Sequence, residues 1–415
     1  MTDRRDYTQK PLRRTVLRTI GMAGLATTFG SGSSIAQTNN NDRVEWSFQG
    51  SYNSSLDEYY PFTSSPTVVD NTVFVGCADN NVYAVDAESG EEKWAFKTNK
   101  GVYSSPTVVD NIVFVGSFDE YLYAVSAETG EEEWAFKTGG GVPSSPTVID
   151  GIVFVGSNDN SLYAVDAETG EQKWAFETGG KVRSSPTVVD GTVFVGSQDN
   201  NLYAVNAETG EQKWAFETND SVFSSPTVNN GTIFVGSQDN NLYAINAETG
   251  EQEWIFGTDY GIYSSPTVVN GTVFFFYFGR NNENNVVAID AETGEQKWGF
   301  ATDNMVRSSP TVADGIVFIG SWDDNLYAVD ADTGQQEWAF ESGGEIGSSP
   351  TVVDGTVFVG SRGGSLYALD AGVSGSSKGS RISLGTLGHH DNGQYSEQSI
   401  TTSSSTQQED SENSD

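Results

Sequence analysis

The chain of 415 residues carries 57 acidic and 21 basic side chains, which gives a formal net charge of −36. A surface this acidic repels phosphate backbones, so the composition excludes a nucleic-acid-binding protein. The one cysteine, Cys77, excludes a disulfide within the chain.

The N-terminal stretch resembles a twin-arginine export signal. Arg13 and Arg14 stand in the run L-R-R-T-V-L-R, a mildly apolar run to Ala26 follows, and the small residues Ser34-Ile35-Ala36 suit cleavage. We therefore predict a signal peptide over residues 1–36, a linker over 37–42 and an extracytoplasmic protein. The alternative, a basic amphipathic helix of the mature domain, is disfavoured because the stretch lies outside the repeats described next. No later segment is apolar enough to predict a transmembrane helix.

The element S-S-P-T recurs eight times. Its prolines are 40 residues apart except for one step of 44, and a period of about 40 residues is typical of a propeller or solenoid. The prolines are Pro66, Pro106, Pro146, Pro186, Pro226, Pro266, Pro310 and Pro350.

The residue pattern within each repeat predicts four short antiparallel strands, here named A to D. Within the repeat 181–220, apolar residues alternate with period two and turn residues separate the runs. Asp190-Gly191 suits a tight hairpin turn with positive φ. Proline occurs only at strand A, which therefore belongs on a sheet edge, innermost in the ring. The expected strands are Ser184–Val189, Thr192–Gly196, Leu202–Ala207 and Gln212–Thr218.

The two ends of the repeat region complete each other. Trp46-Ser47-Phe48 reads as a strand D with no A, B or C before it, whereas the last repeat, from Ser348 to Ala371, has no strand D. We predict an all-β, eight-bladed β-propeller of four-stranded antiparallel blades over residues 43–371. Pairing of the N- and C-terminal strands closes the ring, and we expect a monomer.

The C-terminal stretch 372–415 is rich in Ser, Gly and Gln, with few apolar residues, and predicts a disordered acidic tail. The histidine pair His389 and His390 lies there; a metal site is the alternative to a solvated tail, which we favour. Without residues 1–36, which hold six basic and two acidic residues, the net charge is −40. Acidity spread through every repeat resembles that of proteins from extreme halophiles, where salt screens the repulsion.

From about Arg43 to Ala371 the chain resembles the pyrroloquinoline-quinone-like (PQQ-like) β-propeller repeat family. Its tryptophan-docking motif A-x-D-x-x-T-G-x-x-x-W stands at Ala164 to Trp174 and recurs in seven of the eight repeats, where Ser or Asn can replace the aspartate and Ser the threonine. The family includes quinoprotein dehydrogenases and the non-enzymatic lipoprotein of the outer-membrane β-barrel assembly machinery. Eight equivalent tryptophans on outer strands cannot all face one site, so we predict interblade packing for Trp46, Trp94, Trp134, Trp174, Trp214, Trp254, Trp298 and Trp338.

Chemistry is expected where the repeat departs from its own pattern. Differences concentrate in the D–A and B–C turns, which strand alternation puts at one end of the channel, here called the mouth. Two insertions reach the same end, one of eight residues around Ser51 to Pro61 and one of four in the B–C turn of repeat 6. Aromatic and basic residues there predict a site for an anionic ligand or partner; chance charge balance, or an insertion that plugs the channel, is the alternative. The candidates are Tyr103, Arg183, Phe223, Tyr263, Arg280, Arg307, Trp322 and Arg362.

Two functions follow from these observations. The first is an exported non-catalytic scaffold that binds a protein or glycan partner, with no cofactor. The second is a PQQ-dependent dehydrogenase of an alcohol or sugar, which would use PQQ with calcium. The sequence lacks the adjacent cysteine pair and the long blade insertions of those enzymes, and has no C-x-x-C-H haem site. We therefore favour the scaffold and predict no catalytic residue and no metal site.

Overall fold

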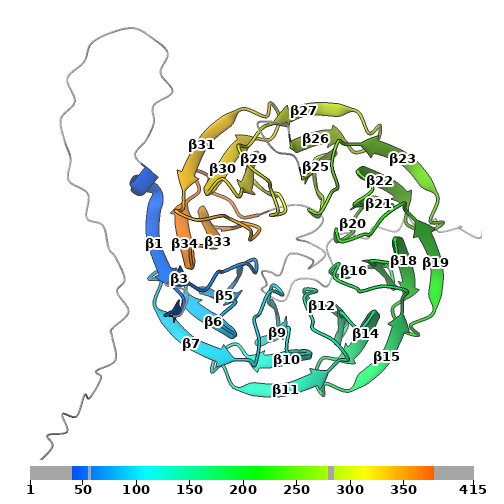
Figure 1. Ribbon diagram of the computed structural model, residues 1–415, viewed down its shortest axis with the longest axis horizontal. Coiled ribbons are helices and arrows are strands. Elements are labelled where there is room, and N and C mark those ends of the chain that lie inside the picture. Colours follow the sequence, from blue (N-terminus) through cyan, green and yellow to red (C-terminus); the bar gives the residue numbers. More distant parts are fainter. Residues whose placement is uncertain (1–39, 55–57, 279–284, 378–415) are drawn as a thin grey trace, which may run out of the picture.

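The computed structural model describes residues 40–54, 58–278 and 285–377. In these residues the chain forms eight four-stranded antiparallel sheets arranged as blades around a central axis (Figure 1). The predicted all-β, eight-bladed propeller is confirmed. The predicted signal peptide, Arg280 and the tail from residue 378, with His389 and His390, lie outside the described residues.

The blades, numbered by the order of their S-S-P-T elements, share one strand pattern. The inner A strands are β4 (Thr67–Val69), β8 (Thr107–Val109), β12 (Thr147–Ile149), β16 (Thr187–Val189), β20 (Thr227–Asn229), β24 (Thr267–Val269), β28 (Thr311–Ala313) and β32 (Thr351–Val353). The B strands are β5 (Thr72–Gly76), β9 (Ile112–Gly116), β13 (Ile152–Gly156), β17 (Thr192–Gly196), β21 (Thr232–Gly236), β25 (Thr272–Phe276), β29 (Ile316–Gly320) and β33 (Thr356–Gly360).

The C and D strands complete each blade. The C strands are β6 (Asn81–Asp86), β10 (Tyr121–Ser126), β14 (Ser161–Asp166), β18 (Asn201–Asn206), β22 (Asn241–Asn246), β26 (Val286–Asp290), β30 (Asn325–Asp330) and β34 (Ser365–Asp370). The outer D strands are β7 (Glu92–Lys97), β11 (Glu132–Lys137), β15 (Gln172–Glu177), β19 (Gln212–Glu217), β23 (Gln252–Gly257), β27 (Gln296–Phe300), β31 (Gln336–Glu341) and β1 (Val44–Gln49).

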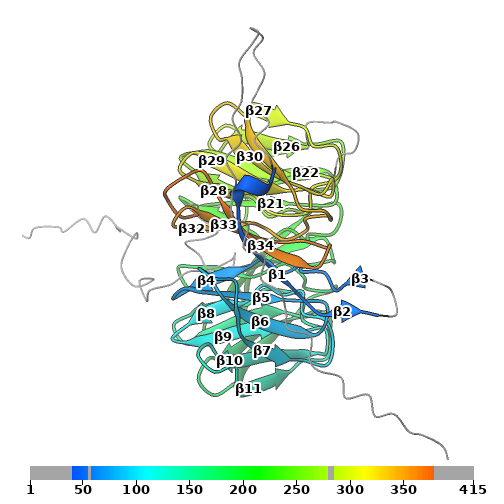
Figure 2. The same cartoon turned by 90° about the vertical axis from the view of Figure 1, so that its left-hand side faces the viewer.

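Blade 8 joins the two ends of the ring. Strand β1 follows a short 3₁₀ helix, η1 (Asn40–Arg43), and pairs antiparallel with β34, so that Trp46 lies opposite Ala368 and Phe48 opposite Leu366. Figure 2 shows β1 against β34 at this seam. The predicted closure by terminal strands is confirmed.

The D-strand tryptophans pack on the next blade. The Trp174 indole donates to the Ala207 carbonyl at 3.0 Å and lies flat on Gly210. Gly210 has φ +74°, and a Cβ there would lie 2.7 Å from the indole ring, so the turn requires glycine. The same indole-to-alanine bond occurs at Trp46, Trp94, Trp134, Trp214, Trp254 and Trp298.

The S-S-P-T element ties the inner strands into rings. The Ser185 amide donates to Ser225 Oγ at 2.9 Å, and Thr187 Oγ1 donates to the Pro226 carbonyl at 2.6 Å. Both bonds join one blade to the next and recur at every interface. The rings close from blade 8 to blade 1 through Ser349 N to Ser65 Oγ and Thr351 Oγ1 to Pro66 O. Because these polar groups are buried, each bond offsets the free-energy cost of taking its donor and acceptor out of water.

Residues 372–377, which the sequence assigned to the tail, lie along the edge of β32. The Gly355 amide donates to Gly375 O at 3.1 Å, and the Ser377 amide donates to Val352 O at 2.7 Å. The Val352 amide in turn donates to Ser377 Oγ at 2.7 Å. An inner strand has unpaired amide and carbonyl groups on its channel edge, and this segment satisfies them in blade 8. No helix in the described ranges is long and apolar enough to cross a membrane.

Candidate functional site

The D–A and B–C turns meet at one end of the ring, the mouth, as expected. The amides of Gln198 and Trp322 in B–C turns donate to the carbonyls of Lys181 and Met305 in neighbouring D–A turns, at 3.0 and 2.9 Å. At the far end, the A–B and C–D turns meet in the same way: the Ala207 amide donates to Gly191 O at 3.0 Å. The two ends therefore present different sets of turns.

Aromatic side chains of blades 5 and 6 stack at the mouth. The rings of Phe223 and Tyr263 have centroids 5.6 Å apart, and those of Tyr263 and Phe278 are 5.3 Å apart. The Arg183 guanidinium lies 6.0 Å from the Phe223 ring centre. Tyr263 is 38% exposed, so part of this stack faces solvent.

The stack continues across blades 7 and 8 through two arginines. The Arg307 guanidinium lies between two rings, 5.3 Å from the centre of Phe278 and 4.3 Å from that of Trp322. The Arg362 guanidinium lies 5.2 Å from the same Trp322 ring. The continuous run is here called the mouth strip: Arg183, Phe223, Tyr263, Phe278, Arg307, Trp322 and Arg362.

The three arginines of the mouth strip differ in their polar partners. Arg183 Nε donates to Asn158 Oδ1 at 2.9 Å, and Arg362 Nε lies 2.9 Å from Glu345 Oε2. Within the described ranges Arg307 makes no ion pair, and burial lowers the pKa of its guanidinium. The Trp322 Nε1–H is also buried, and it has no hydrogen-bond partner among the described residues. Among the residues that the structure describes, the Arg307 guanidinium therefore lies against π faces and has no carboxylate partner for its N–H donors.

Sequence reasoning predicted most of the mouth strip but not its order. Phe278 lies in the B–C turn of blade 6, for which the sequence analysis noted only a four-residue insertion. Tyr103 lies apart from the mouth strip, and its ring centroid is 4.9 Å from that of Phe118 in blade 2. The first insertion contains a small hairpin, β2 (Tyr52–Asn53) and β3 (Glu58–Tyr59), that projects from the ring in Figure 2.

A Tyr–Asp bond that sequence analysis missed holds most blades together at the mouth. Tyr203 OH donates to Asp199 Oδ2 at 2.8 Å, and the same carboxylate accepts the Gly179 amide of the preceding blade. Burial, and then this hydrogen bond, raise the pKa of the Tyr203 phenol. The signal in the sequence is an aspartate with a tyrosine four residues later. The other pairs are Tyr83–Asp79, Tyr123–Asp119, Tyr163–Asp159, Tyr243–Asp239 and Tyr327–Asp323.

Blades 6 and 8 lack this bond. In blade 6, Val287 occupies the tyrosine position. In blade 8, Gly363 replaces the aspartate, and Tyr367 OH donates to Ser342 O at 2.6 Å. These blades flank blade 7, which carries Arg307 and Trp322 and keeps its Tyr327–Asp323 bond.

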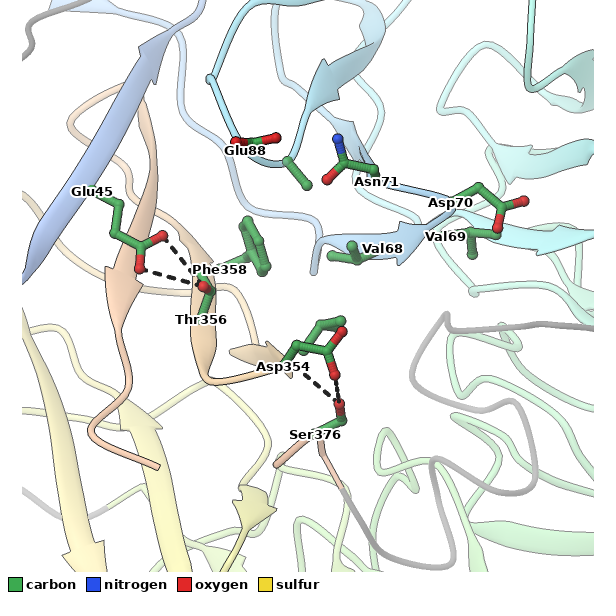
Figure 3. Close-up of a pocket in the computed structure, with 12 residues that line it drawn as sticks. Glu45, Val68, Val69, Asp70, Asn71, Glu88, Asp354, Thr356, Phe358 and Ser376 are labelled. Atoms are coloured by element: carbon green, nitrogen blue, oxygen red, sulfur yellow. Dashed lines mark hydrogen bonds between the residues drawn. The ribbon is translucent and has the colours of Figure 1, made fainter. Parts of the chain in front are cut away.

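Two surface hollows border blade 8, one reaching to blade 7 at the mouth and one on the seam with blade 1. One, of about 370 Å³, is at the mouth beside Arg362 and is lined also by Tyr59, Asp324 and Glu345. The other, of about 600 Å³, is at the far end. Figure 3 shows its carboxylates at Glu45, Asp70, Glu88 and Asp354, with Glu45 bonded to Thr356 and Asp354 to Ser376. Burial raises the pKa of Glu45. The far-end hollow was not predicted from the sequence.

A calcium ion beside PQQ would require several oxygen ligands from the protein. In residues 40–54, 58–278 and 285–377, no group of three or more His, Cys, Asp or Glu side chains is placed to hold a metal ion. The single thiol, Cys77, is buried and contacts the Tyr60 and Pro61 carbonyls. The described residues therefore do not fit PQQ with calcium.

Family models match successive parts of the chain. The model "Beta-alanine-activating enzyme, beta-propeller" matches residues 84–284. "Outer membrane protein assembly factor BamB" matches residues 282–377, and "Glucose/ethanol/alcohol dehydrogenase, beta-propeller domain" matches residues 26–105. No curated protein sequence matches the chain.

Solved structures share the fold at low identity. The computationally designed Ika8 protein has a TM-score of 0.68 at 16% identity, covering 76% of this chain and 98% of its own. BamB from Moraxella catarrhalis has a TM-score of 0.65 at 17% identity, and the match covers 78% of this chain and 98% of BamB. The quinohemoprotein alcohol dehydrogenase from Comamonas testosteroni has a TM-score of 0.66 at 17% identity. The match covers 80% of this chain and 76% of that enzyme. A designed protein, an assembly factor and an enzyme share this ring, so the fold does not select a function.

Proposed function

Because this chain is an eight-bladed β-propeller of PQQ-like repeats, we propose that it is a non-catalytic scaffold that binds an acidic protein partner through the mouth strip. We place it outside the cytoplasm, as its export-signal sequence predicts. The likeness to BamB, whose printed name is that of an outer membrane protein assembly factor, supports a role in protein interaction.

The observation that carries this proposal is the environment of Arg307. On a chain with a net charge of −36, surplus carboxylates are abundant, yet among the described residues this guanidinium lies against the rings of Phe278 and Trp322 and makes no ion pair. The rings fix the plane of the guanidinium, so little side-chain entropy is lost when a carboxylate binds its N–H groups. Partly exposed aromatic rings with arginine are typical of the residues that dominate binding energy.

The contrast between the two ends supports the choice of face. The far-end turns repeat the same residues from blade to blade, and exposed acids such as Glu208 and Glu248 recur there. The D–A turns at the mouth differ in every blade, and the B–C turns differ in most blades, with S-Q-D-N shared by blades 4 and 5. A surface that distinguishes one partner from others needs such differences.

The second candidate is a PQQ-dependent dehydrogenase, favoured by the likeness to the alcohol dehydrogenase ring. Against it, the described residues offer no metal-ligand cluster and no paired cysteines. The two candidates differ in their requirement for quinone and calcium, which allows one experiment to separate them.

The experiment is capture from an extracytoplasmic fraction in molar salt, with the wild-type chain and two double variants. We expect Arg307→Ala/Trp322→Ala to lose the captured partner, while Glu208→Ala/Glu248→Ala retains it. Protease treatment should abolish capture; survival of the captured species would indicate a glycan. A parallel arm adds PQQ with calcium and measures dye reduction by alcohols and sugars. Activity there, with capture unaffected by either variant, would replace the scaffold by the dehydrogenase.

A further inference from the structure

The mouth has one position at which the repeat supplies no side chain. Gly347 stands immediately before the S-S-P-T element of blade 8 and is partly exposed. Apart from its chain neighbours, a Cβ at Gly347 would meet one described atom within 4 Å, the Trp322 indole nitrogen Nε1 at 3.6 Å. This space, here called the Gly347 notch, therefore has room for a group from outside the ring. The other seven blades carry a larger residue at the same position: Thr63, Tyr103, Pro143, Arg183, Phe223, Tyr263 and Arg307.

Two arginines and an indole N–H gather beside the notch. The guanidinium groups of Arg307 and Arg362 lie 4.3 and 5.2 Å from the centre of the Trp322 ring. Burial lowers the pKa of the Arg307 guanidinium, and the like charge of Arg362 lowers it further. The Trp322 Nε1–H is buried and has no acceptor among the described residues. Because an unpaired buried donor costs free energy, an anion here gains from two positive charges and from the hydrogen bond that it accepts.

Glu345 shows which anion the site accepts. Its carboxylate oxygen Oε2 lies 2.9 Å from Arg362 Nε, and its carbonyl accepts the Arg362 amide at 2.7 Å. The two side chains are 37% and 45% exposed and border the mouth hollow of about 370 Å³, so this ion pair is weak and an incoming group reaches it from solvent. The other D–A turns hold no acid at the position of Glu345, where they carry Pro61, Gly101, Gly141, Lys181, Ser221, Gly261 and Met305.

We propose that Glu345 holds the place of a partner carboxylate. On binding, an Asp or Glu side chain of the acidic partner enters the Gly347 notch, replaces Glu345 on Arg362 and accepts the Trp322 indole N–H. The proposal rests on the proposed function of the mouth strip and adds the chemical group that the strip recognises and a competitor within the chain. The exchange keeps Arg362 paired and satisfies the indole N–H, so the incoming carboxylate gains a bond that Glu345 does not make.

The first test is calorimetric titration of the full chain with a hexaglutamate peptide. Glu345→Gln removes the competing charge and should raise the affinity about fivefold, the size expected for an ion pair of this exposure. Its matched control, Glu208→Gln, removes the same charge at the far end and should bind as the wild type does. Gly347→Thr places in the notch the residue that blade 1 carries there, Thr63, and should weaken binding about tenfold or more, because a charge-assisted hydrogen bond is lost.

The second test follows the Trp322 indole N–H by nuclear magnetic resonance, with its signal assigned by its absence in Trp322→Phe. Hexaglutamate should move this signal downfield in the wild type and in Glu345→Gln, as expected for a new hydrogen bond to a carboxylate. Hexaglutamine, which has the same length and no charge, should leave it in place, and so should hexaglutamate added to Gly347→Thr.

Three results would overturn the proposal: no binding of hexaglutamate to the wild type or to Glu345→Gln, equal affinities in Glu345→Gln and Glu208→Gln, or an unmoved Trp322 signal at saturation. If one of them occurs while Arg307→Ala/Trp322→Ala still abolishes capture of the partner, the proposed function stands and the partner engages the mouth strip outside the notch. If that double variant retains capture, the proposed function itself fails, and the notch fails with it as a partner site.

Discussion

The guanidinium of Arg43 lies 4.5 Å from the centre of the Trp338 ring, where the ring of blades is closed by two chain ends. In the other seven interfaces, a glycine turn of the next blade covers the tryptophan, as Gly210 covers Trp174. Blade 8 has no continuous C–D turn, because its strand D comes from the N-terminal part of the chain. Arg43 also donates from Nη1 to Asp370 O at 3.0 Å, so one side chain both covers the indole and links the two ends.

Replacing Arg43 with alanine should therefore destabilise the ring by about 1–2 kcal/mol, through loss of a cation–π contact and a hydrogen bond. Equilibrium urea unfolding measures the difference. The matched control is Lys137→Ala, which removes a cation 5.8 Å from the Tyr121 ring on an exposed strand. We expect the control to lower the free energy of unfolding by less than about 0.5 kcal/mol. Equal decreases in the two variants would contradict the special role of Arg43 at the seam.

The inner rings of hydrogen bonds predict a second effect. Ser225→Ala leaves the buried Ser185 amide without its acceptor, which should cost about 1–3 kcal/mol in the free energy of unfolding. Thr209→Ala removes an exposed turn hydroxyl that accepts from the Glu211 amide. That change should stay within about 0.5 kcal/mol. If Ser225→Ala is no worse than Thr209→Ala, the rings contribute nothing measurable.

Salt should stabilise the protein. With a net charge of −36, repulsion among uncompensated carboxylates opposes folding, and the Debye length falls from about 10 Å at 0.1 M to 3 Å at 1 M. We expect the melting temperature to rise steeply from near-zero to molar potassium or sodium chloride, with little difference between the two cations. A flat response, or a response to one cation only, would contradict a general screening effect.

The eight blades and their closure could be predicted because each follows from local pattern. Period-two alternation, the Asp190-Gly191 turn and the incomplete repeats at both ends are all visible within one or two units. The interblade rings could not be predicted, because Ser185 and Ser225 are 40 residues apart and only the radius of the closed ring brings them to 2.9 Å.

The sequence could predict which residues belong to the candidate site but not which of them are in contact. Departures from the repeat identified Arg307 and Trp322, yet the sequence does not say that Arg307 lies between Phe278 and Trp322. The position of Ser377 was missed for a different reason: a serine- and glycine-rich stretch carries no periodic signal, and its order comes from the unpaired edge of β32.

The central claim is that the mouth strip binds the partner, and calorimetric titration of the captured partner against three chains tests it most directly. Arg307→Ala/Trp322→Ala should weaken binding by about 2 kcal/mol or more, close to 30-fold, while the fold and melting temperature hardly change. Glu208→Ala/Glu248→Ala should bind as the wild type does. Wild-type affinity in the mouth variant, or a loss confined to the far-end variant, would contradict the account and place the working surface elsewhere on the ring.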